Sequence, residues 1–285
     1  MILVTGATGN VGSAAIAELV AKKERVRAFV RDEREAATRF GKGVELAVGD
    51  FGDRASIARA LEGVEALLLS SADGPDKVRW ETSVIDEART AGVRKIVKAS
   101  TMGADPASPM PPLAWHGQIE EHLRASGAPS VILHSCFYMT NVLASAEPIR
   151  QMGKLFAAAG GAKIAMVDPR DTGAVAAVAL TSDDYLSQTL DLTGPEAVTY
   201  ESVADALSRA TGRTIEFVDI PDEAAKGALN QAGLPEWLVT HLSLLFPMLR
   251  GGAFDQPNDK VREVTGRNPR SLDDFARDFA SAFQG

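Results

Sequence analysis

The sequence is poor in cysteine, in long apolar runs and in positive charge, and each deficit removes a class of protein. The single cysteine, Cys136, excludes an internal disulfide framework and a zinc site built from several thiolates, so we expect no metal. It is typical of a reducing cytosol. No apolar run approaches the ~20 residues that cross a bilayer, and the N-terminus lacks a charged and apolar leader. We therefore expect a cytoplasmic protein without a membrane partner. The net charge of -8 argues against a nucleic-acid partner.

The first half of the chain alternates short apolar runs with amphipathic segments. The predicted strands are Ile2–Val4, Arg25–Val30, Val44–Val48, Val64–Ser70, Lys95–Ala99 and Val131–His134. The predicted helices between them are Val11–Ala21, Ser56–Leu61, Lys77–Ala91 and Leu113–Ala125. Alternating strands and helices with right-handed crossovers indicate an α/β fold with a doubly wound parallel sheet.

The pattern loosens in the second half. The expected strands there are Lys163–Val167, Thr189–Thr193 and Thr214–Ile220, and the expected helices are Asp171–Leu180 and Tyr200–Thr211. We expect the C-terminal segments Asp222–Leu249 and Ser271–Phe283 to be mostly helical. Neither repeats nor a low-complexity linker separate the halves. We expect a nucleotide-binding domain over residues 1–150, and a small mixed α/β cap lobe over residues 151–285 that is not an independent domain.

The glycine-rich segment after the first strand is the strongest signal. Its glycines follow the spacing GxxGxxG, between a strand and the start of a helix. In that context Gly6 permits a tight turn, Gly9 lets the backbone approach a pyrophosphate, and Gly12 lets the helix pack on the strand. The helix N-terminus attracts the phosphates. The predicted cofactor contacts of this loop also include Thr8, Asn10 and Val11.

The residues at the end of the second strand indicate whether the protein prefers NADP or NAD. An acid there binds ribose hydroxyls, whereas an arginine accepts a 2′-phosphate. Here Arg31 is followed directly by Asp32. A planar guanidinium pairs well with phosphate, so we favour NADP, and Asp32 keeps NAD as an alternative.

Residues that follow the next strands are further candidates for cofactor contacts. Asp50 and Phe51 could bracket an adenine, or simply precede a helix with Asp53 as its cap. Ligands of open α/β sheets bind beyond the carboxyl ends of the strands. The candidates for ribose or nicotinamide contacts there are Ser70, Ser71, Ser100 and Thr101, and the alternative is that they only end their strands.

Several motifs together resemble the NmrA-like branch of the atypical short-chain dehydrogenase/reductases. They are TGATGNVG at Thr5–Gly12, VRD at Val30–Asp32, GDFGD at Gly49–Asp53, KIVKASTMGA at Lys95–Ala104, HGQIEEHLRASG at His116–Gly127 and CFYMTN at Cys136–Asn141. Within that branch the sequence is similar to NAD(P)H:quinone oxidoreductases and triphenylmethane reductases. The resemblance implies a Rossmann-type domain, a small C-terminal lobe and a substrate cleft between them.

The chain departs from the wider superfamily at its catalytic pair. Most members use a Tyr and a Lys four residues apart, but none of the three tyrosines here is followed by lysine at that spacing. The tyrosine position holds His116, with Glu120 four residues later. Reduction of a simple ketone needs a well-placed proton donor, whereas quinone reduction gives a delocalised phenolate that is protonated late. The sequence therefore predicts hydride transfer from NAD(P)H to quinones or similar flat aromatic compounds.

His116 is the candidate proton donor or substrate orienter, since histidine titrates near neutrality; the alternative is a half-exposed residue at a helix start. The other predicted substrate contacts are Trp115, Phe137, Tyr138 and Asn141, each of which could instead simply pack. Two other functions are compatible with the absence of the Tyr–Lys pair. One is a non-catalytic NAD(P) redox sensor that binds a protein partner, and the other is a tailoring oxygenase or reductase of an aromatic polyketide pathway. A homodimer is compatible with the sequence, which does not determine the oligomeric state.

Overall fold

The computed structural model describes residues 1–284, which divide into two compact units. The first unit combines Met1–Ser135 with Pro169–Asp191, and the second combines Cys136–Asp168 with the residues from Leu192 onward. This division differs from the expected boundary at residue 150, because the chain returns to the first unit to add one more helix and one more strand. The dependence of the C-terminal part on the first unit stays a prediction.

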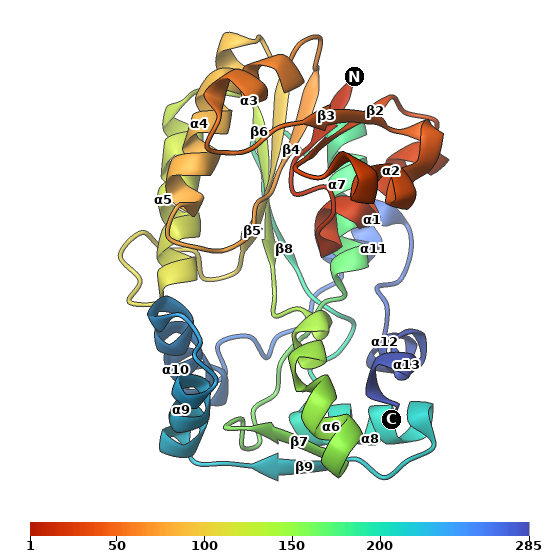
Figure 1. Ribbon diagram of the computed structural model, residues 1–285, viewed down its shortest axis with the longest axis vertical. Coiled ribbons are helices and arrows are strands. Elements are labelled where there is room, and N and C mark those ends of the chain that lie inside the picture. The colour runs from red at the N-terminus through yellow and green to blue at the C-terminus, as the bar shows by residue number, and fades with distance from the viewer. Residues whose placement is uncertain (285) are drawn as a thin grey trace. The chain divides into compact units, whose positions relative to one another are not determined.

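A seven-stranded sheet with the order β3-β2-β1-β4-β5-β6-β8 forms the centre of the first unit (Figure 1). Its strands are β1 (Ile2–Val4), β2 (Val26–Val30), β3 (Glu45–Val48), β4 (Ala66–Leu69), β5 (Lys95–Thr101), β6 (Ser130–Ser135) and β8 (Thr189–Leu192). The strands from β3 to β6 pair in parallel, and β8 extends the edge beside β6. The predicted doubly wound sheet is confirmed. The strand order reverses between β1 and β4, which is where such sheets bind ligands.

Helices cover both faces of this sheet. They are α1 (Asn10–Ala21), α2 (Glu33–Phe40), α3 (Arg54–Ala60), α4 (Lys77–Thr90), α5 (Pro111–Ala125) and α7 (Pro169–Thr181), with a 3-10 turn at Gly41–Gly43. Helices α1 and α7 pack together on one face. A Cβ on Gly173 would lie 2.5 Å from the Cβ of Ala14, so only small residues allow this close approach.

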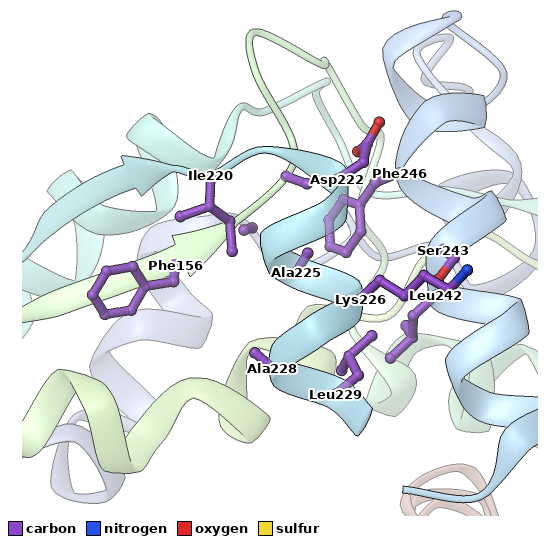
Figure 2. A pocket seen from close by; sticks show the side chains of 12 residues that line it. Phe156, Ile220, Asp222, Ala225, Lys226, Ala228, Leu229, Leu242, Ser243 and Phe246 are labelled. Atoms are coloured by element: carbon purple, nitrogen blue, oxygen red, sulfur yellow. The ribbon is translucent and has the colours of Figure 1, made fainter. Parts of the chain in front are cut away.

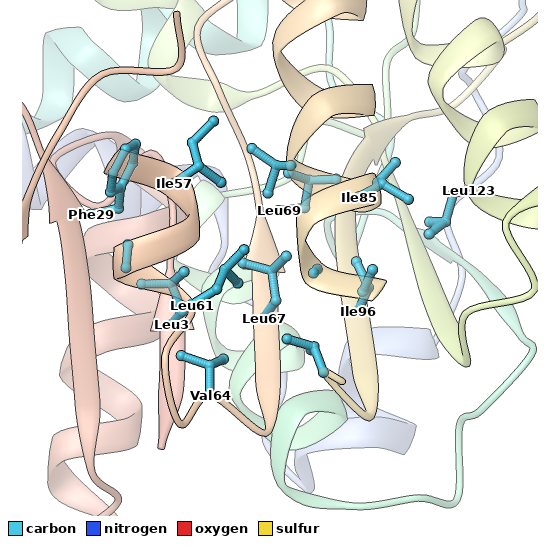
Figure 3. Packing of buried hydrophobic residues seen from close by; sticks show 14 of the residues in the cluster. Leu3, Phe29, Ile57, Leu61, Val64, Leu67, Leu69, Ile85, Ile96 and Leu123 are labelled. Atoms are coloured by element: carbon cyan, nitrogen blue, oxygen red, sulfur yellow. The ribbon is translucent and has the colours of Figure 1, made fainter. Parts of the chain in front are cut away.

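The opposite face carries an apolar cluster of buried residues, beneath α3, α4 and α5 (Figure 3). Leu67 and Leu69 from β4 meet Ile57 from α3 and Ile85 from α4, all at 2 % exposure or less. Each fully buried side chain of this kind contributes about 1.5–3 kcal/mol by leaving water. The cluster holds the strands rigidly, and it thereby fixes where their carboxyl ends lie.

The second unit contains a short parallel pair of strands and several helices. The strands are β7 (Lys154–Ala157) and β9 (Glu216–Asp219). The helices are α6 (Ala146–Met152), α8 (Tyr200–Thr211), α9 (Asp222–Gln231), α10 (Glu236–Arg250), α11 (Lys260–Thr265), α12 (Leu272–Asp278) and α13 (Ala280–Phe283), after a 3-10 segment at Met139–Ser145.

One expectation for this unit was wrong. The segment Lys163–Val167 forms no strand, because its members find single partners on different sides: Ile164 bridges Val198, and Val167 bridges Tyr138. The segment Asp222–Leu249 is mostly helical, as expected, and it divides into α9 and α10 because Gly233 has φ +68° and Pro235 precedes the new helix.

No helix within residues 1–284 is long and apolar enough to cross a membrane. The same residues hold no group of three or more His, Cys, Asp or Glu side chains that could bind a metal ion. Cys136 is buried as a free thiol, and burial raises its pKa to about 12, which makes it a poor nucleophile.

Candidate functional site

The glycine loop is as tight as its sequence predicts. Gly6 has φ +57°, and a Cβ on it would lie 2.8 Å from the carbonyl oxygen of Ser70. A Cβ on Gly12 would lie 2.3 Å from the carbonyl oxygen of Gly6. Gly9 is the N-cap of α1, without a side-chain cap and without an acidic residue in the first turn. This uncapped helix start, lined by backbone, fits a pyrophosphate.

The two residues after β2 have different surroundings. The Asp32 carboxylate caps α2, because its Oδ1 accepts hydrogen bonds from the backbone N–H groups of Arg34 (2.8 Å) and Glu35 (3.0 Å). Arg31 is exposed, and its guanidinium makes no hydrogen bond or ion pair within residues 1–284. The acid is thus engaged with its own helix while the cation is available. This arrangement favours a 2′-phosphate over free ribose hydroxyls.

The candidates after β3 are partly engaged elsewhere. Phe51 stacks on Trp80, with ring centroids 5.8 Å apart, and meets the ring of Phe29 edge-on at 5.5 Å. Asp50 is exposed, and its Oδ1 accepts a hydrogen bond from the Gly52 N–H at 2.7 Å. Asp53 caps α3, as the alternative interpretation holds. A contact of Asp50 or Phe51 with the cofactor stays a prediction.

The hydroxyl residues that follow β4 and end β5 do more than end their strands. The Ser70 N–H donates to Thr5 Oγ1 at 2.9 Å, which ties the end of β4 to the glycine loop. The Ser71 hydroxyl donates to Glu81 at 2.7 Å, and the Ser100 hydroxyl donates to Glu120 at 2.5 Å. The Thr101 hydroxyl donates to the carbonyl oxygen of the next residue, Met102. Ser71 and Ser100 therefore lie at the edge of a group of buried ionisable side chains.

That group is a closed ring of ionisable side chains, which we call the charge ring: Asp73, Lys77, Glu81, Lys98 and His116. Lys98 Nζ lies 2.9 Å from Glu81 Oε2, and Glu81 Oε1 lies 3.1 Å from Lys77 Nζ. Lys77 Nζ lies 3.3 Å from Asp73 Oδ1. The ring closes through His116, whose Nε2 lies 3.7 Å from Asp73 and whose Nδ1 lies 3.2 Å from Lys98 Nζ. Lys77, Glu81 and Lys98 are 2 % exposed or less, so these charges are paired away from water.

The charge ring is neutral only when the imidazole is neutral. Two lysines balance two carboxylates, and a charged His116 would add a third cation. Burial, together with Lys98 and Lys77, lowers the pKa of His116 to about 4. Burial also lowers the pKa of Lys98 to about 8, against the attraction of Glu81. Although burial acts in the opposite direction, Lys77 and Lys98 lower the pKa of Glu81 to about 2. At neutral pH the site therefore presents a neutral imidazole.

The hydrogen bonds also determine which nitrogen of this imidazole carries the proton. The Lys98 ammonium has three N–H groups and faces three acceptors: Glu81 Oε2, the Ala99 carbonyl oxygen and His116 Nδ1. Since Lys98 has no acceptor capacity, Nδ1 accepts. The proton of His116 is therefore on Nε2, the nitrogen that faces Asp73.

Glu120, four residues after His116, holds a second set of polar groups. Its Oε1 accepts from Ser100 and lies 2.8 Å from His134 Nε2, and its Oε2 accepts from Arg124 at 2.9 Å. His134 thus pairs with Glu120. Glu120 therefore orients Ser100, whose Oγ lies 3.3 Å from His116 Nδ1.

The predicted substrate contacts are distributed over both units. Trp115 is half-buried beside His116 on α5, in the first unit. Phe137 and Tyr138 are half-buried and Asn141 is exposed, all in the second unit. Their role as a wall for a flat ring stays a prediction.

The second unit also holds an apolar cavity of about 180 Å³ between β7, α9 and α10 (Figure 2). Phe156, Ile220, Leu229 and Phe246 line it. This volume is below the roughly 300–1,000 Å³ of ordinary ligand pockets, so we assign no ligand to it.

The sequence pattern of the NmrA-like family matches residues 1–271. The chain belongs to this family. It is 35 % identical over 283 residues to the NAD(P)H azoreductase of Xenophilus azovorans, with 99 % of both chains covered. It is 37 % identical over 286 residues, again with 99 % of both covered, to the (4-alkanoyl-5-oxo-2,5-dihydrofuran-3-yl)methyl phosphate reductase of Streptomyces griseus subsp. griseus.

Two solved structures resemble this NmrA-like chain over nearly its whole length. The NADPH complex of the quinone oxidoreductase QOR2 from Escherichia coli has a TM-score of 0.88 at 29 % identity, with 98 % of this chain and 99 % of that chain covered. The NADP(H) complex of the Citrobacter sp. triphenylmethane reductase has a TM-score of 0.84 at 26 % identity, with 98 % and 100 % covered. The predicted family, fold class and resemblance to quinone and dye reductases are confirmed.

Most of the charge ring of this NmrA-like protein was not predicted from the sequence. One signal was present: Lys98 interrupts the apolar run of β5 with a charge, and a lysine in a buried strand needs a partner. Lys77 and Glu81 lie four residues apart on α4, which places them on one face of that helix. Neither pattern names the partner on another element.

Proposed function

We propose that this NmrA-like protein is an NAD(P)H-dependent reductase that transfers hydride to quinones or similar flat aromatic substrates. The glycine loop fits the pyrophosphate, and the unpaired Arg31 supports NADP as the preferred cofactor, with NAD as the alternative. Relatives named azoreductase, quinone oxidoreductase and triphenylmethane reductase support the reaction class. The observation that carries the proposal is the neutral His116 at the tyrosine position. A neutral imidazole is a weak acid, and it suits a hydride acceptor whose reduced form needs little protonation by the enzyme.

The residues of the first unit have separate tasks in this reaction. The bound dihydronicotinamide supplies the hydride. The loop from Gly6 to Gly12 and Arg31 hold the cofactor's phosphates. The Nε2–H of His116 donates a hydrogen bond to the substrate oxygen, and then its proton, as negative charge develops there. In a reduced quinone this charge is spread over the ring, so a neutral imidazole is a sufficient donor.

The direct test is oxidation of NADPH under anaerobic conditions with a panel of quinones and azo dyes, followed by the loss of NADPH absorbance. We expect turnover above the uncatalysed rate with at least one acceptor. NADPH binding without turnover on any acceptor would instead support the redox-sensor alternative. Oxygen uptake coupled to NADPH consumption would support the oxygenase alternative.

Replacement of Arg31 by alanine is expected to raise the KM for NADPH about tenfold and to leave the KM for NADH unchanged. Charge-assisted hydrogen bonds contribute about 1.5–3 kcal/mol, and only NADPH has the 2′-phosphate that would accept them. Arg39→Ala, an exposed arginine near the end of α2, is the matched control. Equal losses for both cofactors in Arg31→Ala would contradict this assignment.

Replacement of His116 by glutamine is expected to lower kcat for quinones about tenfold or more, with an unchanged KM for NADPH. General acids often contribute about 10²–10⁴-fold, and the delocalised product places this case near the low end. His122→Gln changes a half-exposed histidine of α5 that pairs with Asp86, and it serves as the control. An unaltered kcat in His116→Gln would remove His116 from the reaction.

The location and the partners of the protein belong to the same proposal. A small aromatic or quinone substrate is the expected partner, and the acidic composition argues against nucleic acid. The single buried cysteine supports a cytoplasmic location. Sedimentation of the purified protein tests whether it forms a homodimer.

A further inference from the structure

Lys98 is a lysine that the proposed reaction does not yet use. It lies within β5 and is 0 % exposed, and its Nζ pairs with Glu81 and lies close to the Ala99 carbonyl oxygen and His116 Nδ1. Its pairing with Glu81 has a structural role, because removal of one partner of a buried ion pair is strongly destabilising. In addition, Lys98 Nζ lies 3.2 Å from Nδ1 of the candidate proton donor, His116.

We propose that Lys98 is the positioning residue of this reductase: it fixes the Nε2–H tautomer of His116 and donates a proton to Nδ1 as the Nε2 proton passes to the substrate. This inference rests on the proposed function.

The proton movements balance without a charged imidazole. The N–H bond at Nε2 breaks as the oxygen of the reduced substrate gains that proton, and a new N–H bond forms at Nδ1 with a proton from the Lys98 ammonium. His116 is then neutral in its other tautomer, and Lys98 is a neutral amine beside Glu81. After product leaves, Nε2 takes a proton from water and the Nδ1 proton returns to Lys98. The hydride comes from the nicotinamide, so no further reductant is needed.

The surroundings of Lys98 keep it protonated yet able to release a proton. Helix α4 presents Glu81 and Lys77 to it, the loop after β4 presents Asp73, and α5 presents His116. Glu120, also from α5, acts through Ser100 and makes no direct contact with Lys98. The two carboxylates of the ring stabilise the ammonium, while burial and Lys77 disfavour it.

The chain offers a matched control on the same strand. Lys95 is 6 % exposed in β5, and its Nζ donates to the carbonyl oxygens of Ala179 and Ser182 and pairs with Asp183. It makes no contact with His116. Lys95→Met therefore removes a buried lysine without touching the charge ring.

The kinetic test compares the pH dependence of kcat in the wild type, Lys98→Met, Lys98→Arg and Lys95→Met. We expect kcat of the wild type to fall as the pH rises through about 8, the pKa of Lys98, because the amine has no proton to give. Lys98→Met should lower kcat about tenfold and lose this limb, with an unchanged KM for NADPH. Lys98→Arg keeps the charge and should move the limb to higher pH. An unchanged limb in Lys98→Met would overturn the proposal.

A second readout does not depend on turnover. Nitrogen-15 NMR of the resting proteins reports which nitrogen of His116 carries the proton. We expect Nε2–H in the wild type and in Lys95→Met. In Lys98→Met, Nδ1 faces only the Ser100 hydroxyl at 3.3 Å, which can accept as well as donate, while Asp73 still faces Nε2 at 3.7 Å. We therefore expect a mixture of the Nδ1–H and Nε2–H tautomers, and a pure Nε2–H tautomer as in the wild type would overturn the positioning role. If the wild type reduces no acceptor, the proposed function fails, and the tautomer result alone then decides the role of Lys98.

Discussion

Gly12→Ala is expected to weaken NADPH binding at least about 100-fold. The added Cβ would lie 2.3 Å from the carbonyl oxygen of Gly6, 2.9 Å from its carbonyl carbon and 3.0 Å from the Cα of Ala7. All three atoms belong to the backbone, so no side-chain rotation relieves the clash. Helix α1 must move away from the glycine loop, and the N–H groups at its start then no longer converge on the pyrophosphate.

A titration of NADPH followed by its fluorescence measures this loss, and thermal unfolding shows whether the variant is folded. Gly43→Ala is the control, because a Cβ on Gly43 would meet no atom within 4 Å and the residue lies in the same unit. We expect the control to bind NADPH as the wild type does. A folded Gly12→Ala protein whose NADPH affinity is within threefold of the wild type would contradict the assignment of the loop.

The fold was predictable where the signal is local. Buried parallel strands are continuous apolar runs, and the six strands expected in the first half lie where the sequence placed them. Helix α2 was missed because only Ala36 on it is buried, so it has no apolar period to detect. Its N-cap, Asp32, was interpreted only as a possible ribose ligand. The strand predicted over Lys163–Val167 was wrong. An apolar run predicts burial, but a strand also needs a partner strand along its whole length.

The candidate site was likewise predictable only where its residues are close together in the sequence. The glycine loop is encoded within eight consecutive residues, Thr5–Gly12, whose spacing carries the geometry. The charge ring joins a loop after β4, helix α4, strand β5 and helix α5, and only the order of strands in the sheet brings them together. A lysine within a buried strand needs a partner, but nothing in the sequence identifies Glu81 as the partner of Lys98. His116 was identified through the resemblance, and its neutral state follows only from its neighbours.

Glu81→Leu is expected to lower the free energy of unfolding by about 3–5 kcal/mol. Glu81 is 0 % exposed and pairs with both lysines of the charge ring, so its removal leaves two buried cations facing each other without a carboxylate between them. The double variant Glu81→Leu with Lys98→Met should recover part of this loss, because only Lys77 then remains and it keeps Asp73. Asp273→Ala breaks an exposed pair with Arg209 and should cost at most about 1 kcal/mol. Urea unfolding of the four proteins measures these differences, and a small loss in Glu81→Leu would mean that the ring does not stabilise the fold.

The charge ring also determines how stability depends on pH. The pKa of His116 is lowered from 6.5 to about 4, so the unfolded chain binds this proton more tightly than the folded protein does. Stability should therefore be lost as the pH falls from about 6.5 to about 4, by about 3 kcal/mol at about 1.4 kcal/mol per pKa unit. The pKa of Glu81 is lowered from 4.5 to about 2, so its contribution is present above 4.5 and is lost as the pH falls further. Urea unfolding at a series of pH values tests this order. His116→Gln should abolish the loss between about pH 6.5 and 4, whereas His122→Gln should leave it in place, and an unchanged slope in His116→Gln would show that His116 is not the group that titrates.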